Sequence, residues 1–527
     1  MSADNIRAGA TTLGIELGST RIKVCLVDAD PSTVLAVGEF EWGNQLVDGR
    51  WSYALDDVWS GIQAAYRALI ADCESRYGAQ PKTFAAIGIS AMMHGYLAFD
   101  SAGELLVPFR TWRNTSTGPA AAELTREFGV NIPLRWSVAH LYQAMLDHEP
   151  HVPEVRFITT LGGYVHWKLT GERVLGVGDA SGMFPINDAT RDYDLNLLDH
   201  FDRLAEGASV ELALANLLPE ILKAGQPAGT LTLEGAALLD PGQVLRPGVV
   251  LCPPEGDAGT GMVATNSVAP RAGSVSAGTS IFAMVVLERP LARVHPELDV
   301  VTTPTGDPVA MVHCNNGASE LAAWVSIFRR FAELAGVPVE ADTVYSTLFL
   351  EALEGESDAG GILAYNQLAG EPIAGLSDGR PLVVRTNDSQ LTLGNFMRAQ
   401  LYGVFATLSI GMEALEDEGV QLDRIFAHGG VFRTEQVAQR FLAAALRAPV
   451  STAQTASEGG AWGIAVLASY LASGAREPLA EYLQLQVFAG TSFAEIEPRP
   501  EDLVGFVTYL DRYRAGLAIE AAASHTI

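Results

Sequence analysis

The chain carries one short pattern twice, and each copy joins two runs of β-forming residues by a turn of glycine and small hydroxyl residues. The first copy is Leu13–Asp28 (LGIELGSTRIKVCLVD) and the second is Ala272–Leu287 (AGSVSAGTSIFAMVVL). Two such runs around a small polar turn predict a β-hairpin. Because the turns align as Leu-Gly-Ser-Thr and Ala-Gly-Thr-Ser, the sequence favours two halves that open with the same unit. Two unrelated β-turns are the alternative.

Strands and helices are expected to alternate after each hairpin, which is typical of α/β domains. The 527 residues exceed what one hydrophobic core usually serves, so two domains or more are expected. Apolar spacing predicts helices over 56–71, 395–418, 434–447, 458–469 and 500–522, and strands over 84–90, 249–252 and 424–427. We expect an N-terminal domain over 1–262, a C-terminal domain over 263–475, and a tail over 476–527 that packs back on the body.

The charge of the chain restricts its partners. There are 34 Lys and Arg against 62 Asp and Glu, which gives a formal net charge of -28. Nucleic acid and anionic membrane surfaces are bound mainly through Lys and Arg, so neither is an expected partner. A polyanionic substrate such as ATP would have to be held by backbone amides, helix N-termini and a metal ion. A homodimer is compatible with the sequence.

Cysteine usage and hydropathy indicate a globular protein of the cytoplasm. The four cysteines lie far apart, with neither the spacing of a zinc site nor the number needed for a disulfide framework. The N-terminus has no apolar run typical of a signal peptide, and no stretch reaches the roughly 18 unbroken apolar residues of a membrane span.

The two turns are candidates for phosphate binding, because glycine and small residues let backbone amides approach phosphate oxygens. The residues concerned are Gly18, Ser19 and Thr20 in the first turn and Gly278 and Thr279 in the second. Glu16, just before the first turn, could hold Mg²⁺ beside the phosphates. Lys23, just after it, could contact a phosphate as a point charge. An edge-strand carboxylate and a solvent-facing lysine are the alternatives.

Asp257 is the first candidate for a general base. It follows the run Val249–Cys252 in the loop PPEGDAGTG. Ligands of open α/β sheets collect at the carboxyl ends of strands, where a carboxylate can accept the proton of an attacking hydroxyl. The alternative is an aspartate that caps the following helix. Asp179, in the segment GDASG, has the same two interpretations, with capping favoured.

Three further segments suit a polar ligand. Met92-Met93-His94-Gly95 follows a predicted strand, and its histidine could donate to a substrate or serve the structure alone. Trp112-Arg113-Asn114-Thr115 suits a sugar ring and its hydroxyls, or else an interface or surface loop. His428-Gly429-Gly430 and Glu458-Gly459-Gly460 let backbone approach adenine and ribose, or simply turn the chain. The sequence has no Walker loop, dinucleotide fingerprint or zinc motif.

Taken in order, these segments resemble the FGGY family of carbohydrate kinases, within the actin-like ATPase fold. The similarity runs from GIELGSTRIK through ISAMMHG, TWRNTST, GDASG, PPEGDAGTG, SAGTS and AHGGV to EGGAWG. It implies an α/β protein of two ribonuclease H-like domains, with ATP and sugar in a cleft between them. It also implies Mg²⁺-dependent transfer of the γ-phosphoryl group of ATP to a sugar hydroxyl.

The resemblance assigns roles position by position. Asp257 corresponds to the catalytic base, which also contacts the sugar. The two turns correspond to the phosphate loops, and Gly429 and Gly430 to the adenosine site. Met93 and His94 match residues that contact sugar in xylulose kinases, and Trp112 with Asn114 matches a neighbouring Trp-Asn-Asp segment.

Four departures from the family pattern accompany this match. Glu16 stands where the family usually has Asp, Met92 replaces a frequent Gln, Arg113-Asn114 replaces Asn-Asp, and Ala258 replaces a frequent Asn or Gln. Since most of them fall on the sugar side, they put the substrate in question more than the reaction. We therefore expect an ATP-dependent kinase of a ketopentose such as xylulose or ribulose. The alternatives are a kinase of another polyol, hexulose or sugar acid, a non-catalytic sensor of nucleotide and sugar and, more distantly, an actin-like filament protein.

Overall fold

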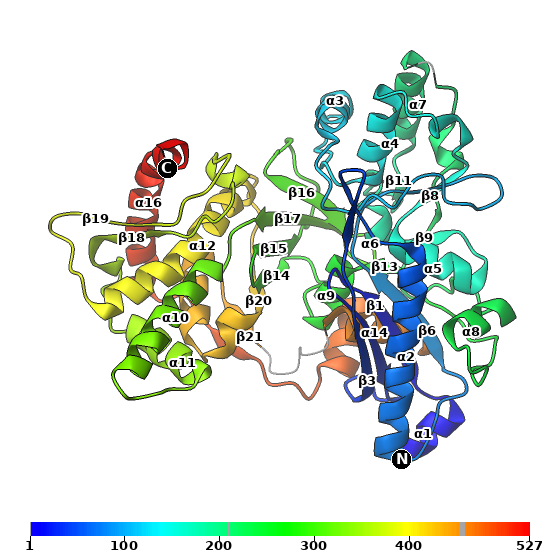
Figure 1. Ribbon diagram of the computed structural model, residues 1–527, viewed down its shortest axis with the longest axis horizontal. Helices are drawn as coiled ribbons and strands as arrows, with labels where there is room; N and C mark the ends of the chain where they lie inside the picture. The colour runs from blue at the N-terminus through cyan, green and yellow to red at the C-terminus, as the bar shows by residue number, and fades with distance from the viewer. Residues whose placement is uncertain (1, 209, 453–458, 527) are drawn as a thin grey trace. The chain divides into compact units, whose positions relative to one another are not determined.

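The computed structural model describes residues 2–208, 210–452 and 459–526, and its chain forms two compact units (Figure 1). The first unit comprises Met1–Ala269, Val300–Val309 and Ala456–Gly490, and the second comprises Pro270–Asp299, Ala310–Thr455 and Thr491–Ile527. The domains predicted at 1–262, 263–475 and 476–527 stay a prediction. The units divide the predicted tail, since its residues up to Gly490 belong to the first unit and the rest to the second.

The first unit is built on a five-stranded sheet of order β13-β6-β1-β2-β3. Its strands are β1 (Thr12–Leu17), β2 (Arg21–Val27), β3 (Val34–Glu41), β6 (Ala86–Ala91) and β13 (Glu255–Gly256). β1 pairs antiparallel with β2 and parallel with β6, and β6 pairs parallel with β13. The predicted first hairpin is therefore confirmed.

The second unit repeats this arrangement in a seven-stranded sheet of order β16-β17-β15-β14-β20-β21-β22. The strands of this sheet are β14 (Ala272–Ala277), β15 (Ile281–Val286), β16 (Leu298–Thr302), β17 (Pro308–Cys314), β20 (Arg424–His428), β21 (Val450–Thr452) and β22 (Ala494–Ile496), and the end of β16 and the start of β17 belong to the stretch Val300–Val309 of the first unit. β14 pairs antiparallel with β15 and parallel with β20, and β20 pairs parallel with β21. The duplicated architecture, with a ribonuclease H-like sheet in each half, is therefore confirmed.

Helices cover both faces of the first sheet because glycines let them approach closely. α2 (Leu55–Tyr77) packs on β2 and β3, where a Cβ on Gly38 would lie 2.0 Å from the carbonyl oxygen of Ala65. α14 (Gly459–Ala472) packs on β1 and β6, where a Cβ on Gly14 would lie 2.1 Å from the carbonyl oxygen of Ala461. Since side chains alternate along a strand and Gly38 and Gly14 are out of phase in register, the two helices lie on opposite faces.

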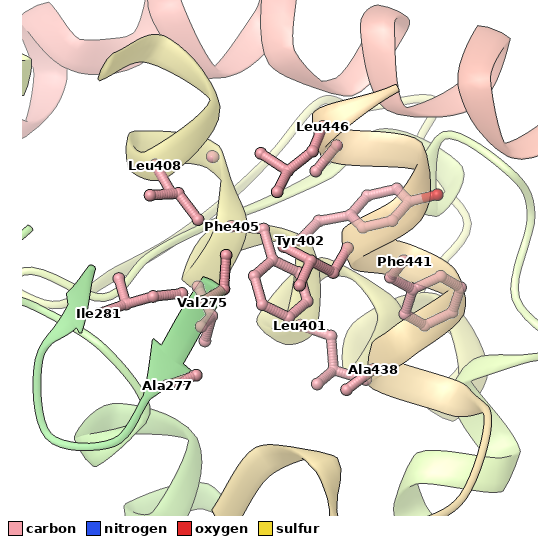
Figure 2. Close-up of a cluster of buried hydrophobic side chains, with 14 of the residues drawn as sticks. Val275, Ala277, Ile281, Leu401, Tyr402, Phe405, Leu408, Ala438, Phe441 and Leu446 are labelled. Carbon is pink, nitrogen blue, oxygen red and sulfur yellow. The ribbon is translucent and has the colours of Figure 1, made fainter. Parts of the chain in front are cut away.

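The core of the second unit lies between its sheet and three helices. Two of them, α12 (Leu393–Asp417) and α16 (Pro500–Thr526), are long, and the third, α13 (Val437–Leu446), is short and almost entirely buried. Figure 2 shows side chains of β14 and β15 in one apolar cluster with Leu401 and Phe405 of α12 and Phe441 of α13. The buried carboxylate of Asp502 on α16 pairs with Arg398 of α12 and Arg440 of α13. The closing helix is therefore joined to the second unit by buried charge as well as by apolar contact.

The remaining elements surround these sheets. In the first unit they are α1 (Ser2–Ala8), β4 (Gln45–Val47), β5 (Arg50–Ser52), β7 (Leu97–Phe99), α3 (Gly118–Phe128), α4 (Ser137–Leu146), β8 (Phe157–Thr159), α5 (Leu161–Thr170), β9 (Val174–Gly176), α6 (Val177–Ala180), β10 (Ile186–Asn187), β11 (Asp192–Tyr193), α7 (Leu195–Gly207), β12 (Glu220–Leu222), α8 (Leu233–Leu239), α9 (Asp257–Ala264) and α15 (Leu479–Tyr482). In the second unit they are α10 (Ser319–Leu334), α11 (Ala341–Ala352), β18 (Ile362–Tyr365) and β19 (Leu382–Arg385). Among all described residues, none of the helices has both the length and the apolar character needed to cross a membrane.

Most predicted elements are present, with two corrections. The run 249–252 is buried except for the half-buried Val250 but makes only isolated bridges, because Pro253 and Pro254 lack the amides that would continue a ladder. The strand at this position is the two-residue β13. The helix predicted over 434–447 begins only at Val437, after a short 3-10 turn over Gly430–Arg433. Glu458, predicted to open the helix now seen as α14, lies outside the described residues.

Candidate active site

Three polar side chains stand side by side near the carboxyl ends of neighbouring strands in the first unit. Glu16 of β1 is in register with Ser90 of β6, and Ser90 is in register with Glu255 of β13. Residues in register on parallel strands share a face, so the three lie on the face that α14 covers. Asp257 follows β13 directly, as the first residue of α9. The strand ends thus gather three carboxyl groups.

Asp257 does not cap its helix, since the N-cap residue is Gly256 and no side chain caps α9. Instead, Oδ1 of Asp257 accepts a hydrogen bond of 3.2 Å from the backbone amide of Met93. The side chain is exposed to solvent, yet desolvation by the surrounding protein raises the pKa of its carboxyl, while the amides of Met93 and Ala258 lower it. A carboxylate held at one oxygen leaves the other free to accept a proton.

Asp179 does not cap a helix either, which corrects the favoured interpretation of GDASG. α6 has Gly176 as its N-cap residue, and Asp179 lies inside that helix. Its Oδ2 accepts a hydrogen bond of 2.6 Å from the hydroxyl of Thr160, and Oδ1 is buried without a hydrogen-bond partner among the described residues. Desolvation, with a further contribution from Asp257, raises the pKa of Asp179 to about 7.

Glu16 is oriented by α14, because its Oε2 accepts a hydrogen bond of 3.1 Å from the amide of Ala461. Desolvation and the charge of Asp257 raise the pKa of Glu16 to about 7, and the charge of Lys23 lowers it. Lys23 is the residue paired with Glu16 across the first hairpin, and its Nζ lies 3.7 Å from Oε1 of Glu39. The cation predicted to meet a phosphate therefore lies between two carboxylates.

The residues around Glu16 are compatible with Mg²⁺. The charge of Asp257 raises the pKa of Glu16, and a divalent cation bound there would relieve this repulsion. Among the described residues, no group of three or more His, Cys, Asp and Glu side chains could hold a metal by itself. Since Mg²⁺ in kinases usually takes one or two carboxylates with water and substrate phosphates, Glu16 with Asp257 nearby suffices for that mode of binding.

The Met93-His94 segment lies next to the candidate base. His94 has a left-handed backbone conformation with φ of 69°, and its Nδ1 lies 3.3 Å from the carbonyl oxygen of Gly182. Desolvation lowers the pKa of His94 well below its usual value, so the ring is neutral. Because Nδ1 must carry the proton that this carbonyl accepts, Nε2 is an acceptor. The histidine considered a hydrogen-bond donor from the sequence is therefore suited to accept a hydrogen bond from a hydroxyl group at Nε2.

The second sugar segment is tied to the strand β5. The Asn114 side chain accepts from the amide of Trp51 at 2.8 Å and donates to the carbonyls of Trp51 at 2.9 Å and Thr111 at 3.0 Å. The Arg113 guanidinium lies 4.2 Å from the centre of the Trp51 ring. Trp112 is 39% exposed and thus available for contact. Both ends of the Asn114 amide are used by backbone, which favours a positioning role for it.

Arg135 is a residue that the sequence did not single out. Its carbonyl oxygen accepts the amide of Gly95 at 3.1 Å, which fixes the loop before α4 beside the Met93-His94-Gly95 segment. Desolvation is the main cause of the pKa shifts of Asp257 and His94, and the charge of Arg135 lowers both pKa values as well. No motif or periodicity marks this arginine, because its neighbours come from a loop distant in sequence.

The first glycine turn is held through its carbonyl groups. The carbonyl of Gly18 accepts from the indole N–H of Trp42 at 2.7 Å, and that of Ser19 accepts from the hydroxyl of Tyr53 at 2.7 Å. The two rings pack together with centroids 4.4 Å apart. The carbonyl of Thr20 accepts from the amide of Trp42 at 3.1 Å. The amide of Gly18 donates within the hairpin, so with these oxygens directed at the protein the turn can offer the amides of Ser19 and Thr20 to an anion.

The second glycine turn is held in the same way. The carbonyls of Gly278 and Thr279 accept from the amides of Ala318 and Gly317, each at 2.8 Å. A Cβ on Gly317 would lie 2.4 Å from the carbonyl oxygen of Gly278, so this close approach requires glycine. The bracing segment was also missed from the sequence, since Asn-Asn-Gly-Ala reads only as a loop before α10.

A cavity of about 620 Å³ adjoins this second turn. Gly278, Thr279 and Gly430 line it together with side chains that the sequence did not indicate, and Asp342, Tyr345 and Arg433 are among the polar ones. The volume is within the range of small-molecule sites. Gly429 is not part of the lining; a Cβ there would lie 2.2 Å from the carbonyl oxygen of Ala277, so this glycine lets β20 end close to β14.

Two units with duplicated ribonuclease H-like sheets, one with strand-end carboxylates and one with a cavity beside a glycine turn, define a protein of the actin-like ATPase class. The chain belongs to the FGGY family of carbohydrate kinases. The models of the family's N-terminal and C-terminal domains match residues 11–244 and 273–472. The resemblance inferred from the motifs is thereby confirmed.

Individual relatives are more distant. A xylulose kinase of Streptomyces coelicolor is 26% identical over 233 residues, which are 42% of this chain and 44% of that protein. A glycerol kinase of Thermococcus gammatolerans is 24% identical over 230 residues, which are 41% of this chain and 44% of that protein. The aligned region thus spans less than half of these relatives. The solved structure of a ligand-bound xylulose kinase from Lactobacillus acidophilus has a TM-score of 0.78 over 98% of this chain and 99% of that chain, at 17% identity.

Proposed function

We propose that this protein is an ATP-dependent sugar kinase that transfers the γ-phosphoryl group of ATP to a hydroxyl of a ketopentose such as xylulose or ribulose. Membership in the FGGY family supports the reaction class. The xylulose kinase among its relatives supports the substrate class, which is the finer part of the proposal.

The observation that carries the proposal is the hydrogen bond from the Met93 amide to Asp257. It joins the candidate base to the segment that is the candidate for sugar binding. A hydroxyl group is a weak nucleophile near neutral pH unless a base removes its proton as it attacks. A carboxylate within hydrogen-bonding distance can act as that base. His94 Nε2, an acceptor in the neutral ring, would bind a neighbouring hydroxyl of the same sugar.

In the proposed reaction the acceptor hydroxyl oxygen forms a bond to the γ-phosphorus while the bond from that phosphorus to the β,γ-bridging oxygen breaks. The hydroxyl proton passes to Asp257, and ADP leaves with the bridging oxygen. Ser19 and Thr20 in one unit and Thr279 in the other are proposed to bind phosphates through their amides, with Lys23 as a nearby cation. Gly18 and Gly278, whose own amides donate within the hairpins, would let the phosphates approach the backbone. Mg²⁺, held through Glu16, would neutralise charge on the phosphates when bound.

The nucleotide base is proposed to occupy the cavity of the second unit. Tyr345 and Arg433 can pack on the faces of a flat base, and Gly430 allows backbone to approach it. Gly429 would act indirectly, through the position of the loop. We further propose a cytoplasmic location and leave the homodimer as a prediction for solution measurement.

Arg135 favours a second candidate, a kinase of a sugar acid. The charge of Arg135 lowers the pKa of both Asp257 and His94, and the same positive charge would attract a carboxylate of the acceptor. The similarity to a glycerol kinase supports a polyol acceptor to the same degree.

A coupled assay of ADP release across ketopentoses, hexuloses, polyols and aldonates tests the proposal. Ketopentoses are expected to give the highest kcat/KM. A preference for aldonates that disappears in Arg135→Gln would support the second candidate. Binding of nucleotide and sugar without turnover on any acceptor would contradict a kinase and indicate a sensor.

A further inference from the structure

Glu255, two residues before the proposed base, is a fully buried carboxyl group that the reaction does not use. It is 1% exposed. Its Oε2 accepts the amide of Asp179 at 3.0 Å, and its Oε1 accepts the amide of Gly178 at 3.4 Å. Together with the 2.8 Å bond from the amide of Gly176 to the carbonyl of Pro254, these bonds attach the loop that carries Asp257 to the segment Gly176–Asp179.

The fit around this carboxyl depends on two glycines. A Cβ on Gly176 would lie 2.1 Å from Oε1 of Glu255, and a Cβ on Gly178 would lie 2.3 Å from Oε2. Contacts that short force a shift of the atoms involved, so any other residue at either position would push the Glu255 side chain out of its place. The sequence Gly176-Val177-Gly178 and the buried glutamate therefore form one matched arrangement.

Burial of these carboxyl groups lowers the stability of the folded protein, which indicates that the arrangement serves the reaction. Buried carboxyl groups lose hydration, and here Asp179 stands next to Glu255 with Oδ1 lacking a hydrogen-bond partner among the described residues. Asp257 in turn contributes to the electrostatic environment of Asp179. The base thus lies at the end of a row of buried carboxyl groups whose positions are set by backbone amides and by the Thr160 hydroxyl.

We propose that Glu255 is a positioning residue for the proposed base: its carboxyl, seated on the amides of Gly178 and Asp179, fixes the turn between β13 and α9 so that Asp257 faces the acceptor hydroxyl. This inference rests on the proposed function. Displacement of a catalytic group by about 1 Å can cost on the order of 100-fold in rate, so a small movement of this turn is sufficient to affect turnover.

The test compares Glu255→Ala, Glu255→Gln, Gly178→Ala and the double variant Glu255→Ala/Gly178→Ala in the full chain. We expect kcat to fall on the order of 10- to 100-fold in Glu255→Ala, with KM for ATP within about twofold of wild type. Gln keeps one acceptor oxygen for the Asp179 amide, so Glu255→Gln should recover much of the rate. Gly178→Ala should lower kcat alone, and should have little further effect once Glu255 is Ala, since the clash is then absent.

Two outcomes would overturn the inference: a folded Glu255→Ala with kcat within twofold of wild type, or effects of Gly178→Ala that simply add to those of Glu255→Ala. If Glu255→Ala does not fold, Gly178→Ala and Glu255→Gln decide by the same split between kcat and KM. Asp257→Ala is measured alongside. If it retains full activity, the proposed function fails; if it is inactive while Glu255 variants are normal, only the positioning role fails.

Discussion

The backbone amide of Met93 donates a 3.2 Å hydrogen bond to Oδ1 of Asp257, which joins the end of β6 to the start of α9. This bond orients the carboxylate without consuming it, since the second oxygen stays available. It also places the base beside His94, whose neutral ring presents an acceptor nitrogen. In the proposed reaction, these two side chains, distant in sequence, would contact the acceptor hydroxyl and a neighbouring hydroxyl.

Trp42→Phe should weaken the binding of ATP by the first glycine turn. The variant keeps the ring stacked near Tyr53 but loses the indole N–H that holds the Gly18 carbonyl. Loss of one such bond is worth about 0.5–1.5 kcal/mol, so KM for ATP should rise roughly 2- to 10-fold. Trp59→Phe is the matched control, because its indole N–H donates to the Tyr164 hydroxyl and not to the turn. Equal KM values for ATP in the two variants would contradict a role of the first glycine turn in ATP binding.

Asp179→Asn should become more stable relative to wild type as the pH rises from 5 to 8. Desolvation raises the pKa of Asp179 to about 7, above its usual value near 4, so the folded state binds a proton that the unfolded chain releases. Such a group contributes most at low pH, and its contribution is lost as the pH rises through the folded pKa. Denaturant unfolding followed by tryptophan fluorescence measures this, since seven of the eight tryptophans lie in the first unit.

The exposed position Asp57 provides the control for that measurement. Asp57→Asn, which removes an exposed carboxyl group from the first turn of α2, is measured under the same conditions for comparison. A difference between Asp179→Asn and wild type that does not change between pH 5 and 8 would mean that Asp179 is ionised throughout, contrary to the buried environment described above.

The fold was predictable from sequence to the extent that its elements repeat or are periodic. The two hairpins and the helix over 393–417 follow from local pattern. The short strand β13 did not, because two prolines interrupt the apolar run and only pairing with β6 makes Glu255–Gly256 a strand. Local pattern is weak evidence where tertiary pairing decides.

The residues of the candidate site also differ in whether the sequence indicates them. Asp257 and the two turns carry glycine-rich sequence signals, whereas Arg135, Trp42, Tyr53 and Glu255 carry none. Their relevance comes from contacts across 20 residues or more, such as the bond between Trp42 and Gly18 and that between Glu255 and Asp179. A single sequence does not specify such pairs, and the motifs therefore give the reacting groups without the residues that hold them.

Tyr345→Ala should weaken nucleotide binding. Tyr345 lines the cavity of the second unit and packs against Phe349 with ring centroids 6.0 Å apart. Stacking of a base on an aromatic side chain is worth about 1–3 kcal/mol, so Kd for ADP measured by calorimetry should rise roughly 5- to 100-fold. Phe331→Ala removes an aromatic ring that is 71% exposed on α10 and lies outside the cavity lining, and should leave Kd unchanged. An unaltered Kd in Tyr345→Ala would place the base elsewhere.

Glu16→Gln should raise the Mg²⁺ requirement. The amide keeps the size of the side chain but removes the charge beside Asp257. The Mg²⁺ concentration for half-maximal turnover should increase on the order of tenfold or more, and chelation of the metal should abolish turnover in both proteins. Lys23→Met, which removes the paired cation across the hairpin, should instead raise KM for ATP. A normal Mg²⁺ dependence in Glu16→Gln would remove Glu16 from metal binding.

The central claim, that Asp257 is the base of a sugar kinase, is tested by sugar-dependent ADP release in Asp257→Ala beside calorimetric binding of ADP. General-base catalysis contributes about 10²- to 10⁴-fold, so turnover should fall at least 100-fold while Kd for ADP stays within about twofold of wild type. Turnover of Asp257→Ala close to that of wild type, on the sugar that wild type prefers, would contradict the account.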